Sequence, residues 1–229
     1  MQYQKLDDDR MQIDSVNISQ GASAATIICD ALRRAIIEGR LNDGDALRQD
    51  EIARMFGTSR IPVREAIAML EQQGLVVTQR YKGAVVAGIS PQEAAEIWDF
   101  RALLEGHVIE AAVPRMTAAT FARARRHLDA FAKTANPRDW GELNRQFHTT
   151  LYAASDLSYH LTVIDKALDR VDRLLRAQLS LSNGLARATE EHEAILAACE
   201  AGNPEQAGQL TRQHILGAKA NLLAQINRD

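Results

Sequence analysis

Two arginines lie four residues apart near the start of a stretch whose composition is typical of a helix. In the segment TSRIPVREAIAMLEQQGLV, Arg60 and Arg64 stand at i and i+4, so their side chains project together. The first turn of a helix presents backbone N–H groups to anions, and a guanidinium binds a phosphate or the edge of guanine through two hydrogen bonds. The pair therefore predicts an anionic partner, for which double-stranded DNA is the first candidate. A solvated helix face on which Arg64 pairs with neighbouring acids is the alternative.

A second set of reactive side chains occupies the other half of the chain. The segment NRQFH places Asn144 and His148 at i and i+4, and both flank the apolar stripe of the same expected helix. His192 and His214 lie in line with apolar residues on two further expected helices. Three imidazoles and an amide oxygen that converge on one point suit zinc or another divalent first-row metal. A single histidine on an apolar face is more often an ordinary core residue, and that is the alternative for each one.

The elements expected around the arginine pair are three helices and a hairpin. Helices are predicted at 24–38 and 49–56, and a third begins after Ser59, which suits an N-cap. The chain then becomes rich in β-branched residues, and LVVTQRYKGAVVAG predicts two short strands joined at Lys82 and Gly83. This layout is that of a winged helix-turn-helix, in which the third helix enters the major groove. The hairpin tip is expected to reach the adjacent phosphates or the minor groove.

The histidines fall in a region that is expected to be helical to the end of the chain. SPQE (Ser90 to Glu93) predicts a capping box with proline just inside the helix. Six helices are expected there, at 91–113, 117–133, 138–154, 157–180, 184–201 and 203–227. The predicted fold is mainly α, with a tail at 1–20, a winged helix-turn-helix domain at 21–89 and an all-helical bundle at 90–229.

Composition limits the classes of function. The chain has 229 residues and a net charge of −3, so it is not a uniformly basic nucleic-acid binder and any basic surface must be local. Its two cysteines, Cys29 and Cys199, stand in apolar helical surroundings, which indicates buried thiols and no disulfide framework. No apolar run approaches the roughly 18 residues that span a bilayer. A cytoplasmic protein without a membrane segment is expected.

The arginine segment resembles a known family of DNA-binding proteins. TSRIPVREAIAMLEQQGLV followed by YKGAVV is similar to the DNA-binding domain of the GntR family of bacterial transcription regulators, and the similarity covers residues 27–87. The core SRIPVRE is specific for the branch of that family with an all-helical effector domain. The resemblance implies that Arg60 and Arg64 contact DNA, with Ser59 and Arg48 as further phosphate or base partners.

The helical region resembles the FCD domain, the effector domain of FadR-like GntR regulators. WDFRALLEGHVIEAA matches the first helix of that domain, and six helices indicate the VanR-type subgroup. Many members carry an acid-x-x-x-His pair and two further histidines on the last two helices. His148, His192 and His214 fit this spacing, with Asn144 in place of the usual aspartate. An amide oxygen binds metals more weakly than a carboxylate, so the choice between Zn²⁺, which is favoured, and Ni²⁺, Mn²⁺ or Fe²⁺ stays open.

The resemblance also implies an effector site. Arg101 belongs to the family's Arg-x-x-x-Glu pair with Glu105, and small organic acids bind over the metal in metal-containing members. Arg101 is therefore expected to hold the carboxylate of such an acid, the alternative being a surface salt bridge to Glu105. The resulting hypothesis is a homodimeric transcription regulator, more specifically a repressor, that binds operator DNA and responds to the effector. Two rivals are a metal-dependent hydrolase, since a metal can activate water, and a regulator whose metal is purely structural.

Overall fold

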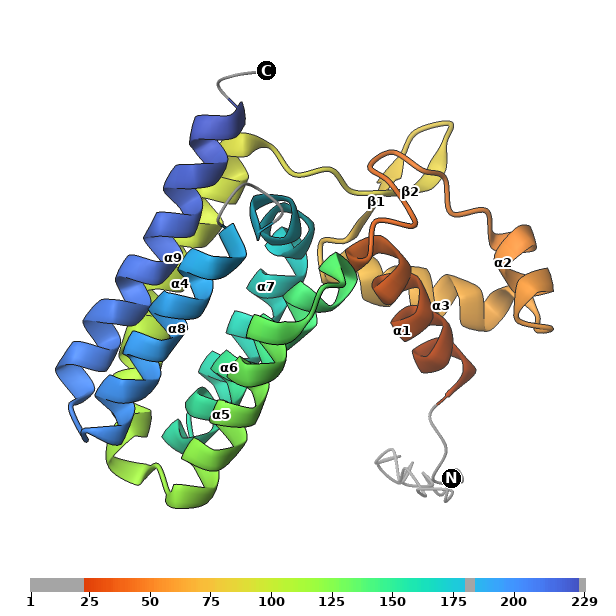
Figure 1. Ribbon diagram of the computed structural model, residues 1–229. Coiled ribbons are helices and arrows are strands. Elements are labelled where there is room, and N and C mark those ends of the chain that lie inside the picture. The colour runs from red at the N-terminus through yellow and green to blue at the C-terminus, as the bar shows by residue number, and fades with distance from the viewer. Residues whose placement is uncertain (1–22, 180–183, 227–229) are drawn as a thin grey trace, which may run out of the picture.

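The computed structural model describes residues 23–179 and 184–226, which form two domains side by side (Figure 1). The first domain contains three helices and a two-stranded sheet: α1 (Ala24–Ile37), α2 (Gln49–Met55), α3 (Arg60–Gln72), β1 (Val76–Gln79) and β2 (Gly83–Val86). The predicted winged helix-turn-helix is confirmed, with helix boundaries close to the expected ones. The expected tail at 1–20 lies outside the described residues.

Helix α3 carries the arginine pair, and its two ends are set by Ser59 and Gly74. Ser59 occupies the N-cap position with an extended backbone, but its side chain makes no capping hydrogen bond. The hydroxyl is therefore available to an external partner. Gly74 follows the helix with a φ of +72°, a left-handed conformation that glycine adopts without strain. The inner face of α3, with Val63 and Leu70 fully buried, packs against α1 and leaves the arginines on the outer face.

Strands β1 and β2 form the wing. They pair antiparallel, with Gln79 opposite Gly83, and residues 80–82 make the turn between them. Tyr81 and Gly83 both have left-handed backbone angles, with φ of 68° and 74°. Glycine takes such a conformation freely, whereas a bulky residue is uncommon there. The tip of the wing is therefore a tight turn whose central residue, Tyr81, is exposed.

The second domain is a bundle of six α-helices in the described part of the chain. They are α4 (Pro91–Ala112), α5 (Ala118–Lys133), α6 (Pro137–Tyr152), α7 (Ser158–Leu179), α8 (Gly184–Glu200) and α9 (Pro204–Ile226), with 3₁₀ turns η1 (Val113–Arg115) and η2 (Ala153–Ser155). The expected all-helical domain is confirmed. Only half of the predicted capping box forms, because Ser90 Oγ accepts from the Glu93 N–H (3.1 Å) while the Glu93 carboxylate contacts Arg170 on α7.

Helices α4 and α9 lie side by side along much of their length (Figure 1). Two glycines permit the close approach: a Cβ at Gly106 would stand 2.6 Å from Arg212 Cγ, and a Cβ at Gly208 would stand 2.6 Å from Glu110 Cγ. Arg212 and Glu110 lie over these glycines and form an ion pair (2.5 Å). The contact fixes the helix of the expected effector arginine against the helix of the last histidine.

The bundle has an apolar core in which Phe147, Leu151 and Ile195 are fully buried. Cys29 in the first domain and Cys199 in the second are buried free thiols, as predicted. Among the described helices, none combines the length and the apolar character needed to cross a membrane.

Candidate metal centre and nucleic-acid interface

Three histidines from three helices meet inside the bundle. Helix α6 supplies His148, α8 supplies His192 and α9 supplies His214, and one ring nitrogen of each lies within 4.8 Å of the others. The ring centroids are 4.7–5.2 Å apart, and all three side chains are buried. Asn144 is buried one turn before His148 on α6. We refer to the three histidines as the histidine cluster.

Hydrogen bonds fix which nitrogen is free in two of these histidines. The Tyr152 hydroxyl donates to Glu105 Oε2 (2.9 Å), so its oxygen accepts from Nδ1 of His148 (3.1 Å). Nδ1 of His214 donates to the Glu191 carboxylate (2.6 Å). Each bond places the imidazole proton on Nδ1 and leaves a lone pair on Nε2, which is how outer partners usually orient metal-binding histidines.

Unpaired nitrogens show that the cluster suits a metal. Among the described residues, Nε2 of His148 and both ring nitrogens of His192 are buried without a hydrogen-bond partner. Buried polar atoms are nearly always paired, and an unpaired one costs about 1–3 kcal/mol. A divalent metal satisfies such lone pairs, because neutral imidazole is a common ligand of Zn²⁺. The side chains present therefore fit an ion held by three nitrogens, with the amide oxygen of Asn144 as a candidate fourth ligand.

The surroundings keep His148 and His192 neutral. Burial lowers the pKa of His148 well below its ordinary value, and the charges of His214 and Arg101 lower it further. Burial likewise lowers the pKa of His192 well below the ordinary value, with further lowering by His214 and His148. A neutral imidazole keeps the lone pair that a metal needs, so both side chains can bind an ion at neutral pH without first losing a proton.

The salt bridge between Arg101 and Glu105 that was considered as the alternative is present, but it lies in the interior of the bundle and not at the surface. Nε of Arg101 donates to Oε1 of Glu105 (2.6 Å), and the two side chains are 4% and 0% exposed. Glu105 also accepts the hydrogen bond of Tyr152, which in turn accepts from His148. Arg101 is thus linked to the histidine cluster through two intervening side chains.

The side chains that orient the histidines were not predicted from the sequence. Tyr152 follows His148 by one helical turn, so the i, i+4 spacing was a usable signal. Glu191 is adjacent to His192 in the sequence but bonds His214 on another helix, so no local pattern reveals its role.

The arginine pair lies on the exposed face of α3. Arg64 is exposed, and Arg60 contacts the carboxylate of Asp50 on α2, an acid from outside the segment that carries the pair. The side chains of Arg60 and Asp50 are 70% and 62% exposed, so this contact contributes little and can be exchanged for a phosphate. The other expected DNA-contacting residues are also exposed: Arg48, Ser59, Lys82 and Gly83.

The wing tip carries an aromatic residue that was not predicted as a contact. Tyr81 is 92% exposed, and Arg80 Cζ lies 5.0 Å from the centroid of its ring. An exposed ring between two cations, Arg80 and Lys82, suits contact with a nucleic-acid backbone. The position of Tyr81 in the predicted hairpin turn was the sequence feature that could have indicated this contact.

Comparison with known families decides the identity of both domains. Residues 24–86 match the family described as bacterial regulatory proteins, gntR family, and residues 96–217 match the FCD domain. The chain belongs to the GntR family. The winged domain is therefore the DNA-binding domain of a GntR regulator, and the helical bundle is its FCD domain.

Relatives of this GntR-family protein are transcription regulators. The chain is 29% identical over 201 residues to the HTH-type transcriptional repressor GlaR of Escherichia coli (strain K12), which covers 81% of this chain and 89% of that protein. It is 33% identical over 141 residues to the gluconate operon transcriptional repressor of Bacillus subtilis (strain 168), which covers 60% and 58% of the two. Because the relatives and both domains are those of regulators, the protein is a transcription regulator, and the hydrolase alternative is wrong.

Solved structures of GntR-like fold agree with this assignment. E. coli McbR/YncC superposes with a TM-score of 0.80 at 21% identity and covers 90% of this chain and 100% of that one, which shows a shared fold. A transcriptional regulator (GntR family member) from Pseudomonas syringae pv. tomato str. DC3000 is 30% identical, with a TM-score of 0.53 and coverage of 89% and 86%.

Proposed function

We propose that this GntR-family protein is a cytoplasmic repressor that binds operator DNA as a homodimer and responds to a divalent metal and a small organic acid. The observation that carries the proposal is the histidine cluster, in which Nε2 of His148 and both ring nitrogens of His192 are buried without a hydrogen-bond partner, in the same bundle as the buried Arg101. Two relatives that are named as repressors support repression over activation.

The DNA-reading part of the proposal rests on α3 and the wing. Arg60 and Arg64 project from the start of α3, where guanidinium groups suit the base edges and phosphates of the major groove. Tyr81 and Lys82 at the wing tip suit the adjacent backbone. Two copies would read two half-sites about one turn of DNA, roughly 34 Å, apart. Exposed apolar side chains on α4 and α9 offer a surface for the second copy: Phe100, Leu103 and Leu216.

The metal part of the proposal assigns His148, His192 and His214 to the ion, with Asn144 contributing an amide oxygen. A bound divalent metal supplies positive charge and open coordination positions for an anionic ligand. Zn²⁺ is favoured because it is commonly bound by imidazole nitrogens, and Ni²⁺, Mn²⁺ and Fe²⁺ are the alternatives. The ring of Phe147 lies 4.6 Å from that of His192 and excludes water from that side of the site.

Arg101 is the proposed second attachment point for a small carboxylic acid. Its Nε is bonded to Glu105, and the two Nη groups at the far edge of the guanidinium suit a carboxylate side by side. Low local polarity would strengthen the contact of the carboxylate with Arg101 and its contact with the metal. Such a ligand changes DNA affinity only if it binds one arrangement of the dimer more tightly than another.

Metal content and thermal stability test the metal part. Purified protein is expected to carry close to one divalent ion per chain, and Zn²⁺ should raise the Tm of metal-free protein because an ion bound only by the folded state stabilises it. His192→Ala should lose the ion. His127→Ala, which changes a histidine of α5 outside the cluster, is the control and should keep it. The metal part of the proposal is wrong if elemental analysis detects no metal and if adding Zn²⁺, Ni²⁺ or Mn²⁺ does not change the Tm.

A purely structural metal is the second candidate, and the deep burial of the three histidines favours it. It predicts the same metal content and the same thermal shift. It differs in one measurable respect: operator affinity, followed by fluorescence anisotropy, would not change with any small organic acid, and Arg101→Ala would alter stability alone.

A further inference from the structure

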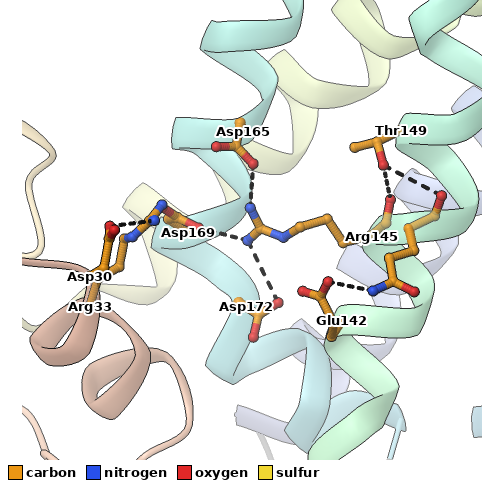
Figure 2. A network of polar contacts seen from close by, with 9 residues as sticks. Asp30, Arg33, Glu142, Arg145, Thr149, Asp165, Asp169 and Asp172 are labelled. Atoms are coloured by element: carbon orange, nitrogen blue, oxygen red, sulfur yellow. Dashed lines mark hydrogen bonds and ion pairs between the residues drawn. The ribbon is translucent and has the colours of Figure 1, made fainter. Parts of the chain in front are cut away.

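Helix α7 presents a row of acids to α6 (Figure 2). Asp165, Asp169 and Asp172 recur at helical spacing and lie on one side of α7. Arg145 of α6 reaches across to them: its guanidinium lies 2.5 Å from Asp165, 2.7 Å from Asp169 and 4.0 Å from Asp172. One cation therefore holds three carboxylates, and the two helices are joined by charge.

Asp169 is shared between the two domains. Its Oδ1 accepts from Nη2 of Arg145 (2.7 Å), and its Oδ2 accepts from Nη1 of Arg33 on α1 (3.4 Å). Arg33 also donates to Asp30 on its own helix (2.9 Å). The side chains of Asp169 and Arg145 are 5% and 15% exposed, so solvent screens this pair much less than a surface pair. A movement of Arg145 would therefore displace Asp169 and alter its contact with Arg33 on α1.

The next residue of α7 holds the end of the DNA-reading helix. Arg170 donates to the backbone oxygen of Gly74, two residues after the end of α3, and contacts the carboxylate of Glu93 in the first turn of α4. Helices α1 and α3 pack against each other inside the winged domain. Helix α7 thus contacts the winged domain through two consecutive residues, Asp169 and Arg170.

Helix α6 connects these contacts to the histidine cluster. It carries Asn144 and His148 on its inner side, while Arg145 points toward α7 (Figure 2). Gly141, about one turn before Arg145, lets the helices approach closely, because a Cβ there would stand 2.9 Å from Asp172 Oδ1. Any shift of α6 that accompanies ligand binding at His148 must therefore move Arg145 against the acids of α7.

The contact between the domains is polar and incompletely filled. A cavity of about 460 Å³ lies between α1 and the α6–α7 pair, and charged side chains line it apart from Ile37. Close-packed apolar interfaces resist small displacements, whereas ion pairs beside a cavity can lengthen or exchange as helices move. The winged domain can thus change its pose without opening either core.

We propose that Asp169 is a positioning residue for DNA binding. Held between Arg145 and Arg33, it sets the pose of the winged domain and transmits changes at the histidine cluster to α1 and α3. The transmission of changes from the histidine cluster rests on the proposed metal site. The positioning of the winged domain rests on the ion pairs alone.

Operator affinity with and without metal tests the inference. An operator fragment is selected from random DNA, and fluorescence anisotropy gives its Kd for metal-free protein and for protein in Zn²⁺. The ratio of the two Kd values is the coupling factor, and about 5–150-fold in either direction is ordinary for linked sites. Arg33→Ala removes the contact to Asp169 at a side chain that is 31% exposed, so the fold should survive while the metal dependence disappears. Arg33→Lys keeps the charge and should keep the coupling factor.

Arg34→Ala is the matched control, because Arg34 lines the same cavity but donates to the backbone of its own helix. It should behave as wild type. Asp169→Asn is a second variant that keeps the shape, removes the charge and should lose the coupling as Arg33→Ala does. If the ion pair only strengthens the fold, Arg33→Ala will lower the Tm and leave the coupling factor unchanged, and this result overturns the inference.

The outcomes separate the inference from the metal proposal. If calorimetry shows Zn²⁺ bound while wild-type Kd for operator is the same in both conditions, the coupling fails and the metal site stands. If no ion binds, the metal proposal fails. The operator Kd values of the metal-free variants then test whether Asp169 positions the winged domain. Arg33→Ala is then expected to change the operator Kd several-fold relative to Arg34→Ala, and equal values would overturn the positioning as well.

Discussion

Burial decides what each arginine of this protein can do. Arg64 on α3 is exposed, so its guanidinium is hydrated and open to the phosphate or base edge that we propose as its partner. Arg101 is buried, and its charge is tolerated because Glu105 is bonded to it at 2.6 Å. Arg145 is mostly buried among three aspartates and acts between helices. An exposed arginine is thus open to an external anion, whereas each buried arginine is held by carboxylates of its own domain.

Arg64→Ala is expected to weaken specific operator binding by about 1–3 kcal/mol, because a guanidinium bound to a base edge supplies discrimination of that size. Lys82→Ala should weaken all DNA sequences alike and reduce the salt dependence, as expected for a phosphate contact. Gel shifts at several salt concentrations separate the two effects. Arg123→Ala, at an exposed arginine of α5, is the control. Wild-type affinity in the double variant Arg60→Ala/Arg64→Ala would contradict the assignment.

Acidification is expected to destabilise the metal-free protein through His148 and His192. Burial lowers the pKa of both well below the ordinary value of 6.5, so below that pH the unfolded chain binds more protons than the folded one. The free energy of unfolding is therefore highest above that value and falls as the pH drops, by up to about 1.4 kcal/mol per pH unit for each histidine.

Urea unfolding in EDTA across that pH range measures the effect. His192→Gln should flatten the pH dependence, since it removes one of the two protons taken up on unfolding. His127→Gln should leave the slope as it is in wild type. Equal slopes for the two variants would show that the buried histidines do not carry the pH dependence.

At the scale of elements, glycines on helix faces determine how closely the helices of the bundle pack. Gly106, Gly141 and Gly208 each lie under a charged side chain of a neighbouring helix, at distances that leave no room for a Cβ. Those charged groups are paired with partners across the helix contact, as Arg212 is with Glu110. Close helix approach and ionic contact are therefore parts of the same arrangement.

Gly208→Ala is expected to destabilise the protein by about 1–3 kcal/mol, the usual cost of overpacking. The new Cβ would stand 2.6 Å from Glu110 Cγ, so either α4 and α9 separate or the Glu110–Arg212 pair breaks. Gly217→Ala on the same helix is the control. Its Cβ would meet nothing nearer than 3.9 Å, and alanine favours helix over glycine by up to about 1 kcal/mol. Denaturant titration should show opposite signs, and two equal losses would contradict the packing argument.

At the scale of the whole molecule, polar contacts join the DNA-binding domain to the effector domain: the Arg33–Asp169 ion pair and the hydrogen bond from Arg170 to the backbone oxygen of Gly74. The polypeptide link between β2 and α4 is short, and α7 supplies the other attachment through Asp169 and Arg170. A polar attachment of this kind allows the relative pose of the domains to change at low cost. This property is what a regulator needs if events in one domain are to alter DNA binding by the other.

Reciprocity between effector and operator is the prediction at this scale. An organic acid that changes operator affinity by some factor must have its own affinity changed by the same factor when operator is present. Calorimetry on a panel of small organic acids, with and without operator, measures both. Arg101→Ala should abolish acid binding if that guanidinium holds the carboxylate. An acid that binds with identical affinity in both conditions would show that the pocket is not a switch.

The sequence by itself determined the elements and the kinds of residue available to them. Helix periodicity, caps and the change to β-branched residues before Lys82 are local properties, so the winged domain and the six helices could be predicted from neighbouring residues. The apolar stripes around His148, His192 and His214 likewise indicated that these side chains face inward. Inward-facing histidines on separate helices were sufficient to predict the cluster that the fold forms.

Only the tertiary structure decided which of several suitable residues meet, and how strongly. Ser59 and Ser90 both suit N-caps in the sequence, yet only Ser90 makes the capping bond. Glu191 bonds His214 and not its sequence neighbour, and Asp169 joins two domains. These outcomes depend on contacts between segments far apart in the chain and on the burial that such contacts create. Burial then sets the pKa values and the strength of each ion pair, which local sequence does not encode.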